Sequence, residues 1–236
     1  GTRTAETDFY DNTMYHIADD FFEVDGVARN YRVFRNCLRE SLSGISLAQA
    51  LDGPVWIVRN RIIDCGICKA TELEGYEGYP FKTNGGDGVG IGSGQVFFYH
   101  NTAWTRDPAS NAMLVKSDVK WKKFTFRNNI WCGQEAGAEI WEDRPSPMDW
   151  DYDDVYAETG LFARYARGRK AFATIEGLRG ATGWLTHGIS KNPGLVDPDK
   201  GDYRLRPGSA CIDAGVVING INDGRFVGKA PDIGAY

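Results

Sequence analysis

The feature that most constrains the fold is a short phrase that recurs along the first two-thirds of the chain. Its clearest copy is VWIVRNRI, in which Val55, Ile57, Asn60 and Ile62 mark the pattern apolar, any, apolar, any, any, Asn, any, apolar. Related copies place an Asn, or in the last case an Asp, at Asn12, Asn36, Asn60, Asn101, Asn129 and Asp153. The steps between these positions are 24, 24, 41, 28 and 24 residues. Repetition on this scale is typical of solenoids, propellers and repeat arrays, and it outweighs any local pattern.

Two kinds of solenoid fit a unit of this length. A leucine-rich repeat also ends its strand with an Asn but holds a helix in each unit, whereas a β-helix winds three short strands around an axis. The stretches between the Asn positions, such as FFEVDG and GISLAQ, alternate with the period of two that is typical of half-buried strands. We therefore predict an all-β, single-stranded, right-handed parallel β-helix of about six visible coils of ~24 residues, and keep the leucine-rich repeat as the less favoured alternative.

The Asn series is interpreted as architecture. Equivalent residues in successive turns of a parallel solenoid lie about 4.8 Å apart. Each side-chain amide can then bond to the copies above and below it. We predict a structural ladder formed by Asn12, Asn36, Asn60, Asn101 and Asn129. We also expect these residues to adopt the left-handed backbone of a sharp corner, which Asn tolerates.

The chain divides into two parts by its spacing and composition. Residues 1–157 are predicted to form the coils, and an inserted loop at about 68–94 explains the longest step. The glycine run GGDGVGIGSG in this loop lacks the phosphate-binding G-x-x-x-x-G-K-[ST] pattern. Residues 158–236 are predicted to be a C-terminal capping segment packed on the same solenoid. It would contain a short helix within residues 171–183, because Phe172, Ile175 and Leu178 share one side.

Composition limits the partners and cofactors. Lys and Arg number 27 against 32 Asp and Glu, a formal charge of −5, so we expect no nucleic acid as partner. No apolar run approaches the ~18 residues that cross a bilayer, so we expect no membrane insertion. The five cysteines include a single C-x-x-C, Cys65 and Cys68, which is weak support for zinc or redox chemistry. We predict structural cysteines and no metal or cofactor, with calcium left open; the sequence predicts no oligomeric state.

The coils and the tail together resemble the right-handed parallel β-helix proteins of the pectate-lyase-like superfamily, of the uncharacterised secreted bacterial type. The RN and HNT phrases between about residues 7 and 156 support the resemblance, as does the ending ATGWLTHGISKNPGLVDPDKGDYRLRPGSACIDAG followed by DIGAY. It implies a secreted or periplasmic protein that acts on acidic polysaccharides as a lyase, hydrolase or epimerase. It also implies further turns and an N-terminal cap, so we expect this chain to be a C-terminal portion.

The predicted site is a strip of side chains on the outer face of one parallel sheet. If the alternation holds, Phe22 and Val24 point into the core while their neighbours point outward. Extending this through successive turns gives an exposed column of Glu23, Asp25, Ser46, Lys82, Asn84, Lys116, Glu139 and Trp141, with Arg144 nearby. A mixed acidic, basic and aromatic strip of this kind suits sugar binding.

Two mechanisms compete for this strip. In a lyase, Lys82 or Lys116 would remove the proton beside a uronic-acid carboxylate or neutralise the developing charge. In a hydrolase, Glu23 and Asp25 would act as the paired carboxylates. Substrate binding is assigned to Asn84, Glu139, Trp141 and Arg144.

We therefore predict a secreted, carbohydrate-active protein that binds a polysaccharide, with cleavage as a further expectation. The chain departs from characterised enzymes of the superfamily, because neither the polygalacturonase residue set nor the calcium-ligating cluster of pectate lyases is found. The alternative is a non-catalytic β-helix: a scaffold, an adhesin or a fragment without its active coils.

Overall fold

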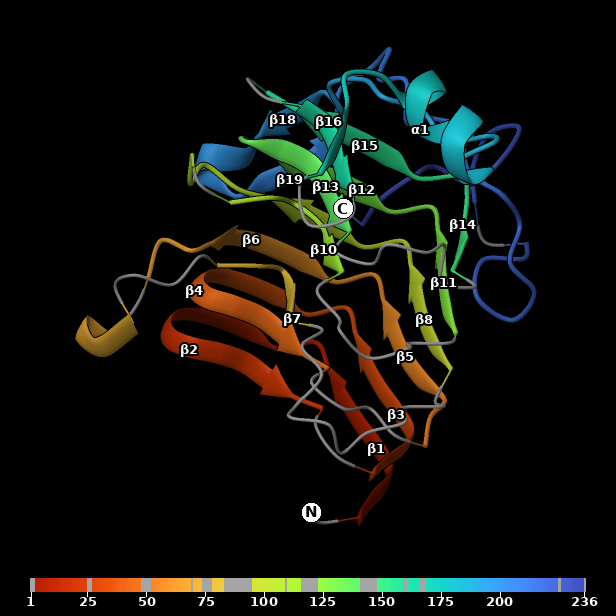
Figure 1. Cartoon of the computed structure of the whole chain (residues 1–236). Coiled ribbons are helices and arrows are strands. Elements are labelled where there is room, and N and C mark those ends of the chain that lie inside the picture. The colour runs from red at the N-terminus through yellow and green to blue at the C-terminus, as the bar shows by residue number, and fades with distance from the viewer. Residues whose placement is uncertain are drawn as a thin grey trace.

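A computed structural model of the protein describes residues 3–24, 27–47, 52–68, 70–73, 78–82, 95–108, 110–115, 123–140, 148–158, 161–165, 169–224 and 226–235. These residues form a parallel β-solenoid of about five turns, with ~24 residues per turn (Figure 1). The prediction of a β-helix is confirmed. The leucine-rich-repeat alternative is wrong, because the coils consist of strands and the α-helix of the described chain, α1 (Ile175–Thr182), follows them.

Successive turns add strands to three sheets. Sheet A, on the right of Figure 1, has the order β1 (Arg3–Tyr10), β3 (Val27–Phe34), β5 (Val55–Val58), β8 (Val96–Tyr99), β11 (Phe124–Arg127) and β14 (Asp149–Trp150). Sheet B runs β2 (Thr13–Glu23), β4 (Cys37–Ser46), β6 (Arg61–Cys65), β9 (Thr102–Trp104), β12 (Ile130–Gly133) and β15 (Asp154–Ala157). Sheet C runs β10 (Leu114–Val115), β13 (Ala136–Ile140), β16 (Leu161–Tyr165) and the antiparallel β17 (Lys170–Phe172).

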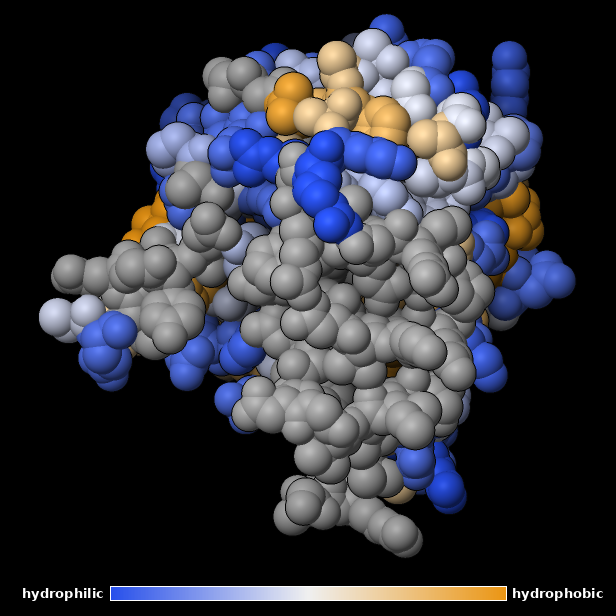
Figure 2. Space-filling model, viewed as in Figure 1, coloured by the Kyte–Doolittle hydropathy of each residue, from blue (hydrophilic) through white to orange (hydrophobic). Residues whose placement is uncertain are grey.

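The core is a set of apolar columns that run along the solenoid axis. In sheet A, Val33 pairs with Ile57, Ile57 with Phe98, Phe98 with Phe126 and Phe126 with Trp150. All five side chains are buried. Since side chains alternate between the two faces of a strand, the residues between these positions point outward. On the coloured part of the face shown in Figure 2, hydrophilic areas surround a hydrophobic patch near the top.

A ladder of side-chain amides lies at the corner between sheets A and B. From Asn36 to Asn129, each Oδ1 accepts hydrogen bonds from the backbone N–H and the Nδ2 of the asparagine one coil earlier. Asn60, for example, accepts from Asn36 at 3.1 and 2.9 Å, and its Nδ2 donates to Asn101 Oδ1 at 3.1 Å and to the Val33 carbonyl at 2.8 Å. The same pattern joins Asn12, Asn36, Asn60, Asn101 and Asn129, and all except Asn12 are fully buried.

Asp153 ends this ladder. Its Oδ1 accepts from the backbone N–H of Asn129 at 2.7 Å, and its Oδ2 accepts from the indole N–H groups of Trp131 and Trp150 at 2.7 and 2.9 Å. A carboxylate is the side chain that can accept on both oxygens, whereas an Asn would turn its NH₂ toward one set of donors. Burial raises the pKa of Asp153 to about 7, and the donated hydrogen bonds oppose that rise. The departure from Asn at this position therefore has a structural reason.

The left-handed residues of this corner are not the ladder asparagines, so that part of the prediction was wrong. Positive φ angles of 54° to 60° belong to the residue before each ladder position: Asp11, Arg35, Arg59, His100, Asn128 and Tyr152. The ladder side chains must point inward to reach one another, whereas the turn is made by the residue whose side chain points out. Each such residue costs on the order of 1–2 kcal/mol in backbone strain.

The C-terminal part first extends the stack and then returns along its outside. The Leu185 N–H donates to the Trp150 carbonyl, and Ile189 forms a parallel bridge with Asp154. The short helix α1 is capped by Thr174 and Gly183 and buries Ile175 and Leu178. Phe172, which the sequence grouped with this helix, lies in β17.

The remaining short elements are η1 (Thr71–Leu73), β7 (Phe81–Lys82), β18 (Leu195–Asp197), η2 (Pro198–Lys200) and β19 (Asp202–Leu205). Strand β7 belongs to the predicted insertion and pairs with the end of β4. The glycine run of the insertion lies outside the described residues. None of the described helices has the length and apolar character that crossing a membrane requires.

The ladder predicts a large and position-dependent effect of amide removal. Asn60→Ala should lower the free energy of unfolding by roughly 3 kcal/mol, because it leaves several buried donors and acceptors without partners. Asn12→Ala, at the exposed end, should cost less than about 1 kcal/mol. Urea unfolding of the two variants measures the difference, and equal costs would contradict the ladder as the main stabilising contact at this corner.

Candidate functional site

Part of the predicted strip comes together on the outer side of β2, β4 and β7. Glu23 pairs with Ser46, and Ser46 pairs with Lys82, so the three positions form one row across neighbouring strands. Glu23 is exposed and Lys82 is partly exposed. Five predicted residues lie outside the described part of the chain: Asp25, Asn84, Lys116, Trp141 and Arg144.

Ser46 is not exposed, so this part of the predicted column is wrong. Its side chain is fully buried. The short hydroxymethyl group stands in register between the longer side chains of Glu23 and Lys82. Facing away from the core is therefore not sufficient for contact with solvent at this position.

Lys82 is held by a buried carboxylate. Its Nζ lies 2.9 Å from Oδ2 of Asp20, whose side chain is 1% exposed. The other oxygen of Asp20, Oδ1, is buried and has no hydrogen-bond partner among the described residues. Lys82 thus fits the role of a cation that neutralises a substrate carboxylate better than the role of a base.

Glu139 lies on β13, where it pairs with Leu114 of β10. Its Oε2 accepts a hydrogen bond from Asn111 Nδ2 at 2.8 Å and lies 3.8 Å from Nη1 of Arg164. Arg164 also pairs with Glu135. Glu139 is therefore part of a polar network on the outside of sheet C, and its assignment to substrate binding stays a prediction.

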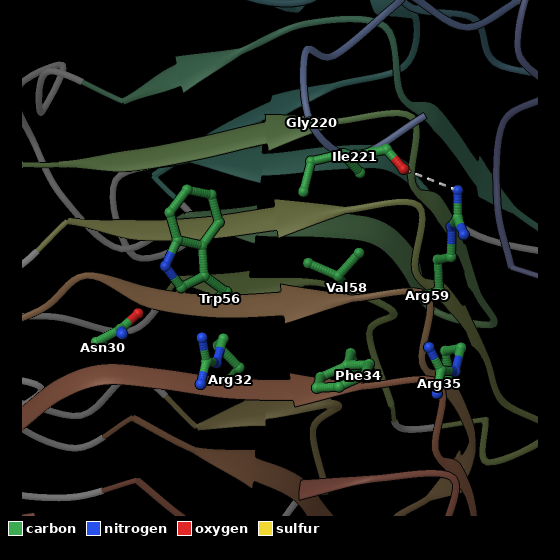
Figure 3. A pocket seen from close by; sticks show the side chains of 9 residues that line it. All are labelled: Asn30, Arg32, Phe34, Arg35, Trp56, Val58, Arg59, Gly220 and Ile221. Atoms are coloured by element: carbon green, nitrogen blue, oxygen red, sulfur yellow. Dashed lines mark hydrogen bonds between the residues drawn. The ribbon is translucent and has the colours of Figure 1, made fainter. Parts of the chain in front are cut away.

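A cavity lined by described residues lies elsewhere, on the outer face of sheet A. It has a volume of about 430 Å³ and is called the sheet A groove below. Figure 3 shows Trp56, Val58 and Phe34 on its floor, with Ile221 of the C-terminal segment along one side and arginines at both ends. The full lining is Asn30, Arg32, Phe34, Arg35, Trp56, Val58, Arg59, Gly220 and Ile221.

Aromatic stacking along the solenoid axis holds the floor of this groove. Trp56 stacks on Phe97, with ring centroids 4.1 Å apart and planes 19° from parallel. Phe34 stacks on Tyr10 at 5.0 Å and 10°. Contacts of this kind add to the stabilisation from buried area and fix the ring orientation. The floor is therefore a preformed apolar surface.

The arginines of the groove are held by exchangeable contacts. Arg32 pairs with Asp8, and Arg35 binds both oxygens of Asp11 at 2.7 and 2.5 Å. Arg35 also lies over the Phe34 ring, 4.9 Å from its centroid. The hydrogen bond from Arg35 holds the pKa of Asp11 below its usual value. Because these pairs are solvent-exposed, their net energies are small and a ligand anion can compete for the guanidinium groups.

A second cavity of about 640 Å³ adjoins the groove at the corner between sheets A and B and shares Arg35 and Arg59 with it. We call it the corner pocket. His100 lies in its wall, where its Nε2 is 2.7 Å from Asn222 Nδ2 and 3.1 Å from Asn128 Nδ2. Amide nitrogens donate, so Nε2 accepts and the ring is neutral. Burial, and secondly the charge of Arg59, lowers the pKa of His100 to about 4.

The cysteines do not form a reactive centre. All five are free thiols, and Cys65, Cys132 and Cys211 are buried. Burial raises the pKa of Cys65 to about 12, which disfavours the nucleophilic thiolate. Within the described residues no group of three or more His, Cys, Asp and Glu side chains could hold a metal ion.

Comparison with known proteins adds no further assignment. No family model matches the chain, and neither a curated protein nor a solved structure matches it. The assignment of the fold as a parallel β-solenoid therefore rests on the structure and not on a similar protein. The pectate-lyase-like resemblance, the secretion and the bacterial origin stay predictions from the sequence.

The sheet A groove was missed from the sequence, although its floor lies inside the repeated phrase. Its residues fill the unspecified positions of that phrase: Arg32, Phe34, Trp56 and Val58, with Phe97 and Tyr99 beyond them. Ordinary solvated positions would be small or charged. Aromatic residues at the outward places of consecutive coils were the available signal.

The buried neutral His100 predicts a defined pH dependence of stability. Its folded pKa, about 4, is below the usual 6.5, so the folded state binds fewer protons than the unfolded state between these values. The stabilisation is complete above pH 6.5 and is lost as pH falls toward 4. Wild type should lose about 3 kcal/mol over this range relative to His100→Gln, measured by urea unfolding at several pH values. His16→Gln is the exposed control, and a wild-type profile parallel to that of His100→Gln would refute the prediction.

Proposed function

We propose that this β-solenoid binds an acidic polysaccharide in the sheet A groove. The observation that supports the proposal is an aromatic floor flanked by Arg32, Arg35 and Arg59, on a chain whose formal charge is −5. Cationic side chains gathered in one hollow of an acidic protein indicate an anionic ligand more specifically than a generally basic surface would.

The aromatic floor and the arginines of the groove each fit one part of a sugar acid. A sugar ring presents C–H groups on its faces and polar groups at its edge, and binding sites for such ligands combine an apolar surface with a few fixed polar groups. Trp56 and Phe34 offer the apolar surface, and the guanidinium of Arg32 or Arg35 can bind a carboxylate through two parallel hydrogen bonds. Their present partners, Asp8 and Asp11, are themselves carboxylates.

The form of the groove favours a polymer over a compact ligand. Outward positions repeat from coil to coil about every 4.8 Å along the axis. The row Arg32, Trp56 and Phe97 continues across three strands of sheet A. An extended chain could contact several such positions together. The proposal keeps the secreted or periplasmic location and the bacterial origin that the resemblance implies.

Cleavage of an acidic polymer that contacts the outer side of β2, β4 and β7, away from the sheet A groove, is the second candidate, and one contact favours it. Lys82 is fixed by the buried Asp20 carboxylate and lies in one row with Glu23. A fixed cation beside an exposed carboxylate could stabilise the charge that develops when the proton next to a uronic-acid carboxylate is removed. The non-catalytic alternative, a binding or scaffold module, needs the sheet A groove alone.

The binding proposal predicts a specific loss in Trp56→Ala. This variant should bind a uronic-acid polymer at least ~10-fold more weakly than wild type, because buried aromatic anchors carry much of the energy of an interface. Titration calorimetry with a panel of uronic-acid polymers and a neutral glucan measures the effect. Tyr15→Ala removes an aromatic side chain that is 61% exposed on β2, outside the groove, and should bind like wild type.

Two controls separate binding from folding. Thermal unfolding of Trp56→Ala should stay cooperative, since Trp56 is only partly buried. Equal affinity of wild type and Trp56→Ala for every polymer that binds would refute the groove as the binding surface.

The cleavage candidate predicts an unsaturated product. Wild type should release chain ends with ultraviolet absorbance from a polymer that it binds, and Lys82→Met should bind that polymer equally well but release none. New reducing ends without this absorbance would favour a hydrolase instead. Absence of both products from all bound polymers would leave the non-catalytic function.

A further inference from the structure

The corner pocket contains an arginine, Arg61, that does not line the sheet A groove. Three arginines line it, from neighbouring positions of two coils: Arg35 and Arg59 at equivalent corner positions, and Arg61 at the start of β6. The other walls come from His100 and from the C-terminal segment through Asn222 and Asp232. The pocket is thus closed by residues that are distant in the sequence.

Arg61 has no acceptor within the described residues. Arg35 binds Asp11, and Arg59 donates from Nη2 to the Ile221 carbonyl at 3.1 Å. Among the residues that the structure describes, Arg61 forms no side-chain hydrogen bond and no ion pair, although it is partly buried in the pocket wall. A guanidinium has five N–H donors, so Arg61 can bind an anion through several hydrogen bonds.

Among the described residues that line the pocket, positive charges outnumber negative ones by one. Three arginines face two carboxylates, Asp11 and Asp232. Asp11 is engaged by Arg35, and Asp232 Oδ1 accepts the Asp213 N–H at 2.8 Å. His100 adds no charge, since its Nε2 accepts hydrogen bonds from Asn222 and Asn128. The unmatched group is an arginine that faces a cavity of about 640 Å³.

We infer that the corner pocket is an oxyanion subsite in which Arg61 binds a carboxylate of the polymer that lies in the sheet A groove. This inference rests on the proposed function and extends it, because it assigns the acidic group of the ligand to one residue. The two cavities adjoin at Arg35 and Arg59, so we place one sugar unit on the aromatic floor and the carboxylate of a neighbouring unit at Arg61. A planar carboxylate matches the fork of a guanidinium, as a free sulfate or phosphate also does in part.

The test pairs a protein variant with a ligand variant. Arg61→Gln should bind a uronic-acid polymer about 10-fold more weakly than wild type, the usual order of effect for a charge-assisted pair. Methyl esterification of the polymer should weaken binding to wild type by a similar factor and should not weaken binding to Arg61→Gln further. Arg29→Gln is the control, since Arg29 is 67% exposed and does not line either cavity.

The possible results separate the subsite from the proposed function. If Trp56→Ala loses binding but esterification weakens wild type and Arg61→Gln equally, the groove stands and the subsite is overturned. If wild type binds no polymer, the proposed function fails. In that case, titration with sodium sulfate that gives Arg61-dependent binding would show a site for free anions and would overturn the assignment to a polymer carboxylate. Non-additive losses from Arg61→Gln and esterification support the inference.

Discussion

The buried amide ladder is the interaction on which the rest of the structure depends. Each buried ladder asparagine accepts two hydrogen bonds from one neighbouring coil and donates to the other, as Asn60 does with Asn36 and Asn101. Because these groups are buried, a coil that slipped by one residue would leave them unpaired and would also turn its apolar side chains outward. The ladder therefore fixes the register of sheets A and B together. That register brings Arg32 beside Trp56, and Trp56 beside Phe97, on the outer face.

The same strands form the core with one face and the groove with the other. Substitutions are tolerated differently on the two faces. In β8 the side chain of Phe98 is buried and stacks on Phe126 at 4.5 Å, whereas its neighbour Phe97 points outward and stacks on Trp56. The inward residue is constrained by close packing on all sides. The outward residue has no such packing on its solvent side, so more side chains fit there. An aromatic residue at that place adds stability through stacking, but it also creates an apolar surface that a ligand can use.

The fold was predictable because its cause repeats in the sequence. Inward positions and ladder positions meet the same physical requirement in every coil, so six copies of one phrase define the period and the strand type. The site was less predictable for two reasons. Outward positions meet no common requirement, so the burial of Ser46 between Glu23 and Lys82 depends on neighbours that alternation cannot supply. The groove also needs Ile221, which lies 162 residues from its partner Arg59 and has no signal in the repeat. Likewise the repeat does not explain why position 153 is an Asp. The reason is its hydrogen bonds from two indole N–H groups.

The position of the sheet A groove depends on where the C-terminal segment stops covering the corner between sheets A and B. The left-handed corner residues lie in one column, and its later members hold the C-terminal segment. Arg59 donates to the Ile221 carbonyl, His100 accepts from Asn222, and Asn128 binds the backbone of Val216. These contacts help to offset the backbone strain of the corner. The earlier members, Asp11 and Arg35, lie beyond this set of contacts and pair with each other at the surface. The left-handed corner residues therefore bind the C-terminal segment where it covers them. Where that cover ends, they form part of the wall of an open, cationic groove.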